Sequence, residues 1–132
     1  MGWEVKCVDA AFCIDLANGD PGAVTRAEQL SDSGERLAIP APALTEFLVG
    51  AFHQGGRRLS QALEMASELE VLDITEAISI EAARAGGECS RRGETVGTMD
   101  LLVAATARHH RAHILSRDTD FTRIAGVVLE TY

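Results

Sequence analysis

The sequence is poor in several residues and patterns that mark large classes of proteins. It has 3 cysteines among 132 residues, and Cys7, Cys13 and Cys89 form neither a CxxC pair nor an even set. We therefore expect reduced, packed thiols and no zinc site. No apolar run approaches the roughly 20 residues that a membrane-spanning helix requires, and the first residues lack the pattern of a signal peptide. From these absences we expect a soluble, cytoplasmic protein that does not interact with a membrane.

Sequence signatures of covalent and nucleotide-dependent enzymes are also absent. There is no GxSxG motif, no arrangement of the Ser-His-Asp kind, no GxGxxG and no Gly-rich phosphate loop. The segment Asp9-Ala10-Ala11-Phe12 does not match the DxDx[TV] pattern expected of a metal phosphatase on a similar sheet. Covalent hydrolases, dinucleotide enzymes and phosphatases of that class are therefore not indicated.

Lysine is nearly missing, and the net charge is negative. Lys6 is the only lysine among 12 basic residues, and the formal charge is -8. Such a charge argues at first against binding to nucleic acid, which normally depends on Lys and Arg. However, arginine is the residue suited to bidentate phosphate contacts, and divalent cations bound at acidic residues would change the local potential. The net charge therefore does not exclude an RNA substrate.

Strand and helix patterns alternate along a chain that is 46% hydrophobic. We expect one domain over residues 1–132, with short connections, a mostly parallel sheet and helices on both of its faces. Asp73 and Glu76 fit a capping box before one of the helices. The expected strands are 5–8, 37–39, 71–74, 112–115 and 127–129, and the expected helices are 10–18, 21–33, 43–53, 57–70, 75–92 and one that begins after Gly97.

Four carboxylates occur at comparable boundaries between elements. Asp9 and Asp118 follow strands, and Glu46 and Asp100 fall in the first turns of predicted helices. Ligands of parallel sheets bind outside the carboxyl ends of the strands, so these four groups can meet at one edge. Like charges at short range raise one another's pKa, and a divalent ion such as Mg²⁺ or Mn²⁺ removes that penalty. Taken singly, each residue could equally be a helix cap or an exposed carboxylate.

Four segments, in this order, resemble the motifs of PIN-domain ribonucleases, specifically the VapC toxins of VapBC toxin-antitoxin modules. The resemblance covers nearly the whole chain. The segments are Val8-Asp9-Ala10-Ala11-Phe12-Cys13-Ile14-Asp15-Leu16, Pro42-Ala43-Leu44-Thr45-Glu46-Phe47-Leu48-Val49-Gly50, Met99-Asp100-Leu101-Leu102-Val103-Ala104-Ala105-Thr106-Ala107 and Leu115-Ser116-Arg117-Asp118-Thr119-Asp120-Phe121.

The resemblance implies a fold, an activity and partners. The fold is an α/β, PIN-like three-layer α/β/α sandwich with a mostly parallel central sheet of about five strands. The activity is a Mg²⁺- or Mn²⁺-dependent endoribonuclease that leaves a 5′-phosphate and a 3′-hydroxyl. The partners are RNA, a small VapB-type antitoxin whose C-terminal segment crosses the acidic cleft, and a second copy of the chain in a homodimer.

The same resemblance implies roles for individual residues. Asp9 and Asp100 match the principal metal ligands, and Glu46 matches the acidic partner on a helix. The fourth acidic position falls at Asp118, with Asp120 as the second choice. The hydroxyl that often orients a carboxylate is matched by Ser116.

One position departs from the family pattern. The family usually has Thr or Ser directly after the first aspartate, and here Ala10 stands there. Loss of such a hydrogen-bonding partner commonly weakens metal binding or activity by about 10 to 100 fold. The alternative function is therefore a catalytically weakened PIN-like binding module that acts through its antitoxin complex.

Other charged residues have simpler interpretations. We expect Asp15 to be solvated or a minor partner. Arg117, beside the acidic site, and Ser116 are the candidate contacts to the substrate. The pairs Arg57-Arg58 and Arg91-Arg92 are typical of exposed helix ends, although they could contact phosphates. The positions of His109, His110 and His113 at the end of a helix favour a role with the helix dipole over zinc binding.

Overall fold

A parallel sheet runs through the centre of the protein in a computed structural model that describes residues 5–132. The strands lie in the order β3-β2-β1-β4-β5, and each neighbouring pair is parallel. The chain therefore moves away from β1 in one direction through β2 and β3, and in the other through β4 and β5. The carboxyl ends of β1 and β4 lie side by side at this switch point, where ligands of open α/β sheets bind. The strands are β1 (Val5–Val8), β2 (Arg36–Pro40), β3 (Glu70–Leu72), β4 (His113–Leu115) and β5 (Leu129–Glu130).

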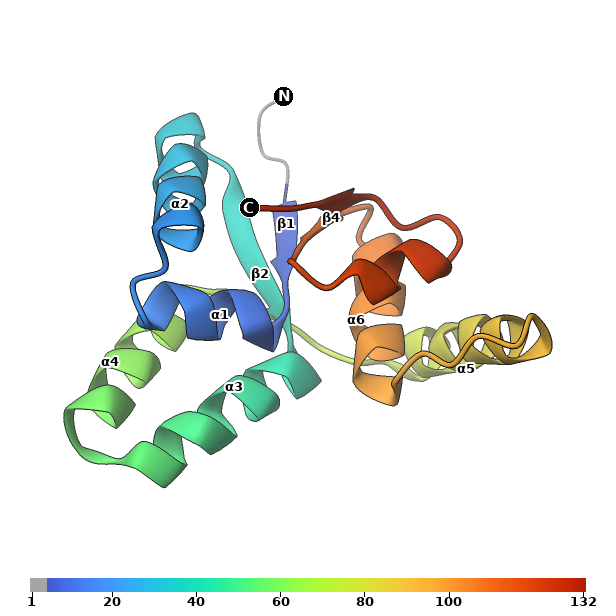
Figure 1. The fold of residues 1–132 in the computed structure, drawn as a ribbon, viewed down its shortest axis with the longest axis horizontal. Helices are drawn as coiled ribbons and strands as arrows, with labels where there is room; N and C mark the ends of the chain where they lie inside the picture. The colour runs from blue at the N-terminus through green and yellow to red at the C-terminus, as the bar shows by residue number, and fades with distance from the viewer. Residues whose placement is uncertain (1–4) are drawn as a thin grey trace.

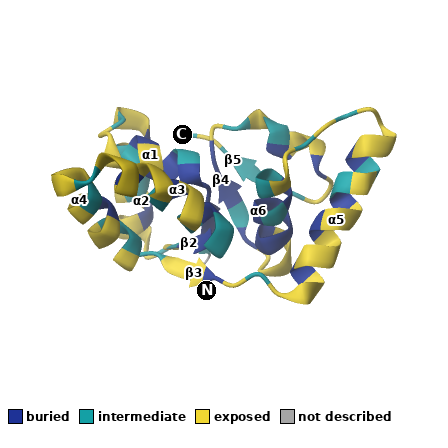
Figure 2. Cartoon of the chain, turned by 90° about the horizontal axis from the view of Figure 1, so that it is seen from below, coloured by how far each residue is buried: buried dark blue, intermediate teal, exposed yellow. Residues whose placement is uncertain are grey.

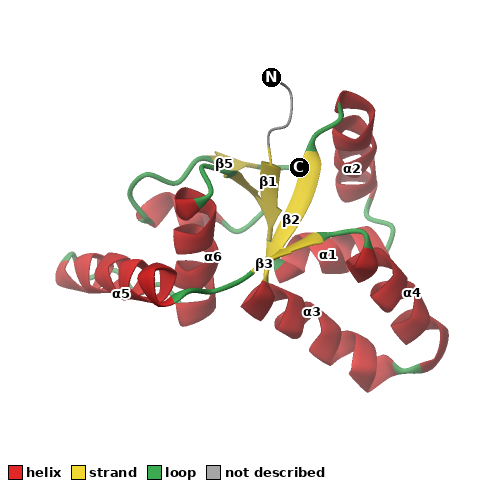
Figure 3. Ribbon diagram, turned by 180° about the vertical axis from the view of Figure 1, so that it is seen from behind, coloured by secondary structure: helices red, strands yellow, loops and turns green. Residues whose placement is uncertain are grey.

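Helices cover both faces of this sheet (Figure 1). In Figures 1 and 3, α1 to α4 lie on one side, whereas α6 lies on the other side with α5 packed against it. The helices are α1 (Ala10–Ala17), α2 (Pro21–Ser33), α3 (Ala41–Gln54), α4 (Gly56–Ser67), α5 (Glu76–Arg91) and α6 (Thr98–His109). The predicted α/β/α sandwich is confirmed, and the described sheet is parallel throughout.

The core lies between the sheet and the inner helices, and α6 is its most enclosed helix (Figure 2). Val103, Ala104 and Thr106 are fully buried, so side chains on several faces of α6 are shielded from solvent. The hydroxyl of Thr106 donates to the carbonyl of Leu102, which satisfies a polar group in this apolar setting. All 3 cysteines are free and buried, as expected from their apolar contexts.

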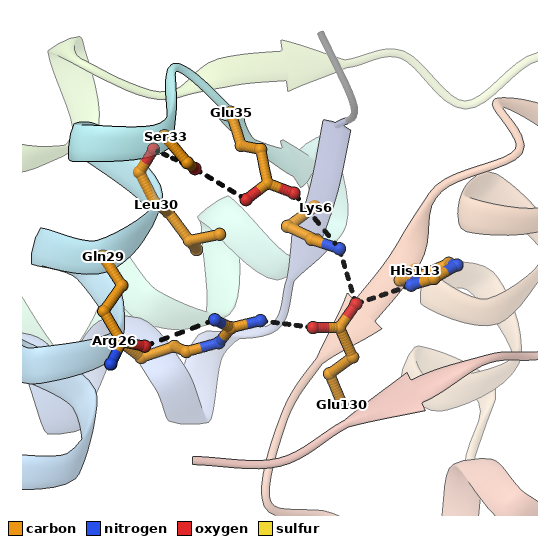
Figure 4. Close-up of polar contacts among 8 residues, drawn as sticks. All are labelled: Lys6, Arg26, Gln29, Leu30, Ser33, Glu35, His113 and Glu130. Atoms are coloured by element: carbon orange, nitrogen blue, oxygen red, sulfur yellow. Dashed lines mark hydrogen bonds and ion pairs between the residues drawn. The ribbon is translucent and has the colours of Figure 1, made fainter. Parts of the chain in front are cut away.

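A second feature, a set of ion pairs around Glu130, ties α2 to β1, β4 and β5 (Figure 4). The Glu130 carboxylate of β5 accepts from the Lys6 ammonium at 2.5 Å, and its second oxygen pairs with the Arg26 guanidinium of α2. The Nδ1 atom of His113 is also 2.5 Å from Glu130, and Lys6 reaches Glu35 at 3.4 Å. We call these five residues the Glu130 network. His113 lies in β4, within the expected strand 112–115, and not at the end of the preceding helix, where it was also grouped with His109 and His110.

Most elements lie close to their predicted positions, but one helix cap differs. Thr75 caps α5, because its hydroxyl accepts the N–H of Ile78 at 3.2 Å. Asp73 is exposed and Glu76 is the first helical residue, so the predicted capping box was wrong. A threonine can supply the capping oxygen as well as an aspartate can, and it stands one residue before the helix.

No helix in the described part of the chain is long and apolar enough to cross a membrane.

Candidate metal centre and active site

Asp9 is the first carboxylate that the chain brings to the switch point of the sheet. It follows β1 directly and caps α1, because its side chain accepts the N–H of Phe12 at 2.9 Å. Its other oxygen accepts from the hydroxyl of Ser116 at 2.5 Å. Burial raises the pKa of Asp9, which is 7% exposed, while the hydrogen bonds from Ser116 and Phe12 oppose that rise. Asp9 is thus a fixed carboxylate with its two oxygens held in place.

Ser116 links this carboxylate to the loop that follows β4. Its hydroxyl donates to Asp9 and accepts the N–H of Asp118 at 2.9 Å. Asp118 in turn caps the 3-10 helix η1 (Thr119–Arg123), because it accepts the N–H of Asp120 at 2.9 Å. One chain of hydrogen bonds therefore sets the positions of three acidic residues from two distant parts of the sequence.

Asp100, Asp118 and Asp120 form a compact acidic cluster. Each offers one carboxylate oxygen, and these oxygens all lie within 4.8 Å of one another. Asp100 comes from the first turn of α6, and the other two come from the loop after β4. All three side chains are only partly buried, so solvent and a ligand can reach them. We refer to these three residues as the acidic cluster.

The negative charge of the acidic cluster is not balanced by nearby arginine or lysine side chains. Burial, and then the neighbouring carboxylates of Asp118, Asp9 and Asp120, raise the pKa of Asp100 to about 7. In residues 5–132, neither Asp9, Asp100 nor Asp118 forms an ion pair with an arginine or a lysine. Asp120 has one distant cation, the guanidinium of Arg123 at 3.8 Å.

These residues fit a hard divalent cation. The three ligands available in the acidic cluster are carboxylate oxygens, which suit Mg²⁺ or Mn²⁺ and do not suit a thiolate- or imidazole-seeking metal. Partial exposure leaves room for the waters that Mg²⁺ retains. A bound cation would also remove the repulsion that raises the pKa of Asp100.

Two of the predicted acidic residues, Asp9 and Glu46, lie outside the acidic cluster. Asp9 is close enough to raise the pKa of Asp100. Glu46 is exposed on α3. The helix begins at Ala41, with Pro42 in its first turn, which is two residues earlier than predicted. Glu46 therefore lies in the second turn of α3 instead of the first.

Sequence reasoning missed two residues beside the site. Asp15 is 8% exposed and pairs with Arg117, so the expectation that it is solvated was wrong. Tyr132 donates a hydrogen bond to Asp15 at 2.6 Å. The signal for Asp15 was its position as the only charge in the apolar helix α1, which indicates a buried group that needs a partner. Nothing in the sequence around Tyr132 pointed to it.

The histidines take no part in this arrangement. His109 and His110 are exposed at the end of α6, where their rings contact each other, and His113 belongs to the Glu130 network. Within residues 5–132, the acidic cluster is the one group of three or more His, Cys, Asp or Glu side chains with the spacing of a metal site.

Comparisons with known proteins point in one direction. The model of the PIN domain family matches residues 6–127. The ribonuclease VapC11 of Mycobacterium tuberculosis is 35% identical over 113 residues, which cover 84% of this chain and 83% of the relative. The tRNA(fMet)-specific endonuclease VapC of Shigella flexneri is 26% identical over 128 residues, which cover 95% of this chain and 96% of that protein.

Solved structures with the same fold include toxin-antitoxin complexes. A chain of VapBC2 from Rickettsia felis, bound to a promoter DNA fragment, superposes with a TM-score of 0.82 at 21% identity, covering 96% of this chain and 98% of that one. A chain of DNA-bound VapBC from Salmonella typhimurium gives a TM-score of 0.79 at 25% identity and covers 98% of both chains.

Proposed function

The chain belongs to the PIN-domain family as a ribonuclease of the VapC toxin type, and from this premise we propose that it cleaves RNA with a divalent metal ion at its acidic cluster. The observation that supports the metal most directly is the approach of three carboxylate oxygens, from Asp100, Asp118 and Asp120, to within 4.8 Å of one another. The uncompensated charge there gives the cation a physical reason to bind.

We propose Mg²⁺ or Mn²⁺ as the ion, with the acidic cluster as its ligands and Asp9 as the adjacent carboxylate. When bound, such an ion lowers the pKa of an attacking water and stabilises the leaving oxygen of a phosphodiester. The protein's part is to fix the ligands in advance. The hydroxyl of Ser116 fixes both the carboxylate of Asp9 and the backbone of Asp118.

The products proposed for this reaction are a 5′-phosphate and a 3′-hydroxyl. The proposal needs no covalent nucleophile, because no serine or cysteine at the site is paired with a histidine within the described residues. Glu46 stays a candidate as the outer acidic partner that the family resemblance implies. Its exposed position predicts that Glu46→Gln reduces cleavage less than substitution of Asp100 does.

An antitoxin of the VapB type is the proposed partner, since the structural relatives named above are VapBC complexes. An exposed apolar surface supports a protein partner. Val49 and Phe52 of α3 are 64% and 61% exposed. Such surfaces mark interaction sites in soluble proteins. We also propose a homodimer, a cytoplasmic location and a single domain over residues 1–132.

The alternative function is a weakened binding module that retains the antitoxin complex and lacks cleavage. Ala10 is the observation that favours it, because a buried methyl group, 2% exposed, stands where the family usually has a hydroxyl. The hydroxyl of Ser116 already donates to Asp9, which partly makes up for this absence. A weakened module would bind its partner and leave cellular RNA uncut.

Mapping of RNA ends after brief induction tests the proposal. We expect new 5′-phosphate ends with the wild type, none with Asp100→Asn, and growth arrest only with the wild type. Co-expression of the cognate antitoxin should restore growth. The same RNA ends with both proteins, or no new ends with either, would contradict the proposed nuclease.

A further inference from the structure

One oxygen of Asp15 holds two donors at the edge of the site. Its Oδ2 atom accepts from the Tyr132 hydroxyl at 2.6 Å and lies 3.3 Å from Nε of Arg117. The side chain of Asp15 is 11% exposed, whereas that of Arg117 is 64% exposed. A buried carboxylate thus fixes the inner end of a guanidinium whose outer end faces solvent.

The backbone of Arg117 is fixed by the same loop that carries the acidic residues. Arg117 lies between Ser116 and Asp118, which are joined by a hydrogen bond of 2.9 Å. In residues 5–132 the guanidinium has no acceptor other than Asp15. Because Nε is the atom that faces Asp15, the two terminal nitrogens keep their N–H donors for a ligand.

Tyr132 holds Asp15 from the other side. Its ring packs edge to face on Phe12, with the ring centroids 5.1 Å apart, and its hydroxyl reaches Asp15. Phe12 is also the residue whose backbone N–H donates to the Asp9 carboxylate. Burial and the hydrogen bond to Asp15 raise the pKa of Tyr132, so the phenol stays a neutral donor. Tyr132, Asp15 and Arg117 therefore form one chain that ends beside the metal ligands.

We propose that Asp15 and Tyr132 are positioning residues that hold Arg117 so that its terminal nitrogens bind an RNA phosphate next to the scissile bond. The inference rests on the proposed ribonuclease function and adds a phosphate subsite to it. A guanidinium fixed at Nε loses less side-chain entropy when it binds a phosphate, and its fork suits two phosphate oxygens. The carboxylates of the site repel an anionic substrate. The fixed guanidinium of Arg117 beside them would attract its phosphate.

The chain offers a closely matched control pair on α5. The Nε atom of Arg84 lies 3.3 Å from a carboxylate oxygen of Glu81, and the Arg84 side chain is 63% exposed. The distance, the atom and the exposure of the arginine thus match those of Arg117. The pairs differ in the acid, because Glu81 is 48% exposed and lies away from the loop after β4.

The test measures RNA affinity in the Asp100→Asn background, where cleavage does not interfere. The probe is a fluorescent single-stranded RNA that spans a cleavage position mapped with the wild type, and anisotropy is followed at several salt concentrations. We expect Arg117→Ala to weaken binding about 10-fold and to reduce the salt slope by about 0.7, the value for one phosphate contact on a single strand. Arg84→Ala should change neither quantity.

The positioning residues make a sharper prediction. Asp15→Asn should weaken binding about 3- to 5-fold, and Tyr132→Phe about 2-fold, because the ring stays on Phe12 while the hydroxyl is lost. Neither substitution should have an effect when Arg117→Ala is already present, since both act through Arg117. Tyr132→Phe also keeps the test valid if Asp15→Asn fails to fold.

Several results would overturn the inference. Unchanged or tighter binding by Asp15→Asn, or an equal loss with and without Arg117, would mean that Asp15 supports the fold alone. These outcomes leave the proposed function intact as long as the wild type cuts RNA. If the wild type leaves no RNA ends to map, the proposed function itself fails and the subsite fails with it.

Discussion

The acidic cluster lies on α6 and the loop after β4, whereas the Glu130 network lies on β1, β4, β5 and α2 and before β2. The two groups treat buried charge in opposite ways. In the Glu130 network, one carboxylate is surrounded by Lys6, Arg26 and His113 (Figure 4). Burial alone would raise the pKa of Glu130, but hydrogen bonds from Lys6 and His113 lower it to about 2. In the acidic cluster, burial and further carboxylates raise the pKa of Asp100 to about 7.

In this molecule a structural charge is balanced by its neighbours, whereas a functional charge is not. The Glu130 network satisfies its own charges and joins β1, β4 and β5 to α2, so its residues support the fold. The acidic cluster is left with unbalanced charge, which a bound cation would neutralise. Substitutions in the Glu130 network should therefore lower stability, and substitutions in the acidic cluster should lower activity.

The largest effect is expected for Asp100→Asn on catalysis. Replacing this ligand should lower RNA cleavage by about 1000-fold or more. The asparagine amide is neutral, so it is a poorer ligand for a divalent cation than the carboxylate is. The cleavage rate of a mapped RNA fragment in Mg²⁺ measures this loss. The far-UV circular dichroism spectrum should be unchanged, and cleavage within 10-fold of the wild type would remove Asp100 from the metal site.

Glu130→Gln should show the reverse pattern. Removing the charge shared by Lys6 and Arg26 should lower the free energy of unfolding by about 2 to 4 kcal/mol, because the partly buried cations lose their common acceptor. Urea unfolding measures this loss. The control is Glu70→Gln, whose exposed pair with Arg36 at 2.8 Å should contribute less than about 1 kcal/mol. Equal losses in the two variants would show that the Glu130 network adds nothing beyond surface pairing.

Ser116→Ala should weaken Mn²⁺ binding by about 10 to 100 fold. The hydroxyl fixes Asp9 and the backbone of Asp118 together, and no other hydroxyl in the described residues donates to Asp9. Ser116→Thr keeps the hydroxyl and serves as the control, although its extra methyl group must fit a fully buried position. An unchanged affinity in Ser116→Ala would argue that the ligands are placed by the backbone alone.

The smallest effect concerns the stability of the metal-free protein against pH. The folded pKa of Asp100 lies above its unfolded value, so the folded state binds more protons between about pH 4 and 7. Stability should therefore fall as the pH rises through this window and stay low above it. Because Asp100 is only partly buried, solvent screening reduces the full effect of the shift to on the order of 1 kcal/mol. Urea unfolding in chelator at pH 5 and pH 8 measures this change. Asp100→Asn should flatten the pH dependence, and a parallel dependence in this variant would contradict the assignment.

The fold was predictable because its local patterns agree with the tertiary structure. The strand before Asp9 and the apolar helix after Gly97 are clear in the sequence, and both have the expected form. The Thr75 cap was missed because Asp73 offered an equally good local motif. Local sequence does not say which of two possible caps the chain will use.

The site was less predictable, because it depends on where helices begin and on contacts between distant residues. α3 begins at Ala41, two residues earlier than predicted, so Glu46 falls in its second turn, where it is exposed. The buried pairing of Asp15 depends on Tyr132, which lies 117 residues away in sequence. Neither the register of a helix to a single residue nor such a long-range contact follows from spacing alone.

Calorimetric titration of the metal-free protein with Mn²⁺ tests the central claim most directly. We predict one saturable binding process in the wild type that Asp100→Asn abolishes and Glu130→Gln preserves. No binding in the wild type, or the same binding in Asp100→Asn, would contradict a metal centre at the acidic cluster.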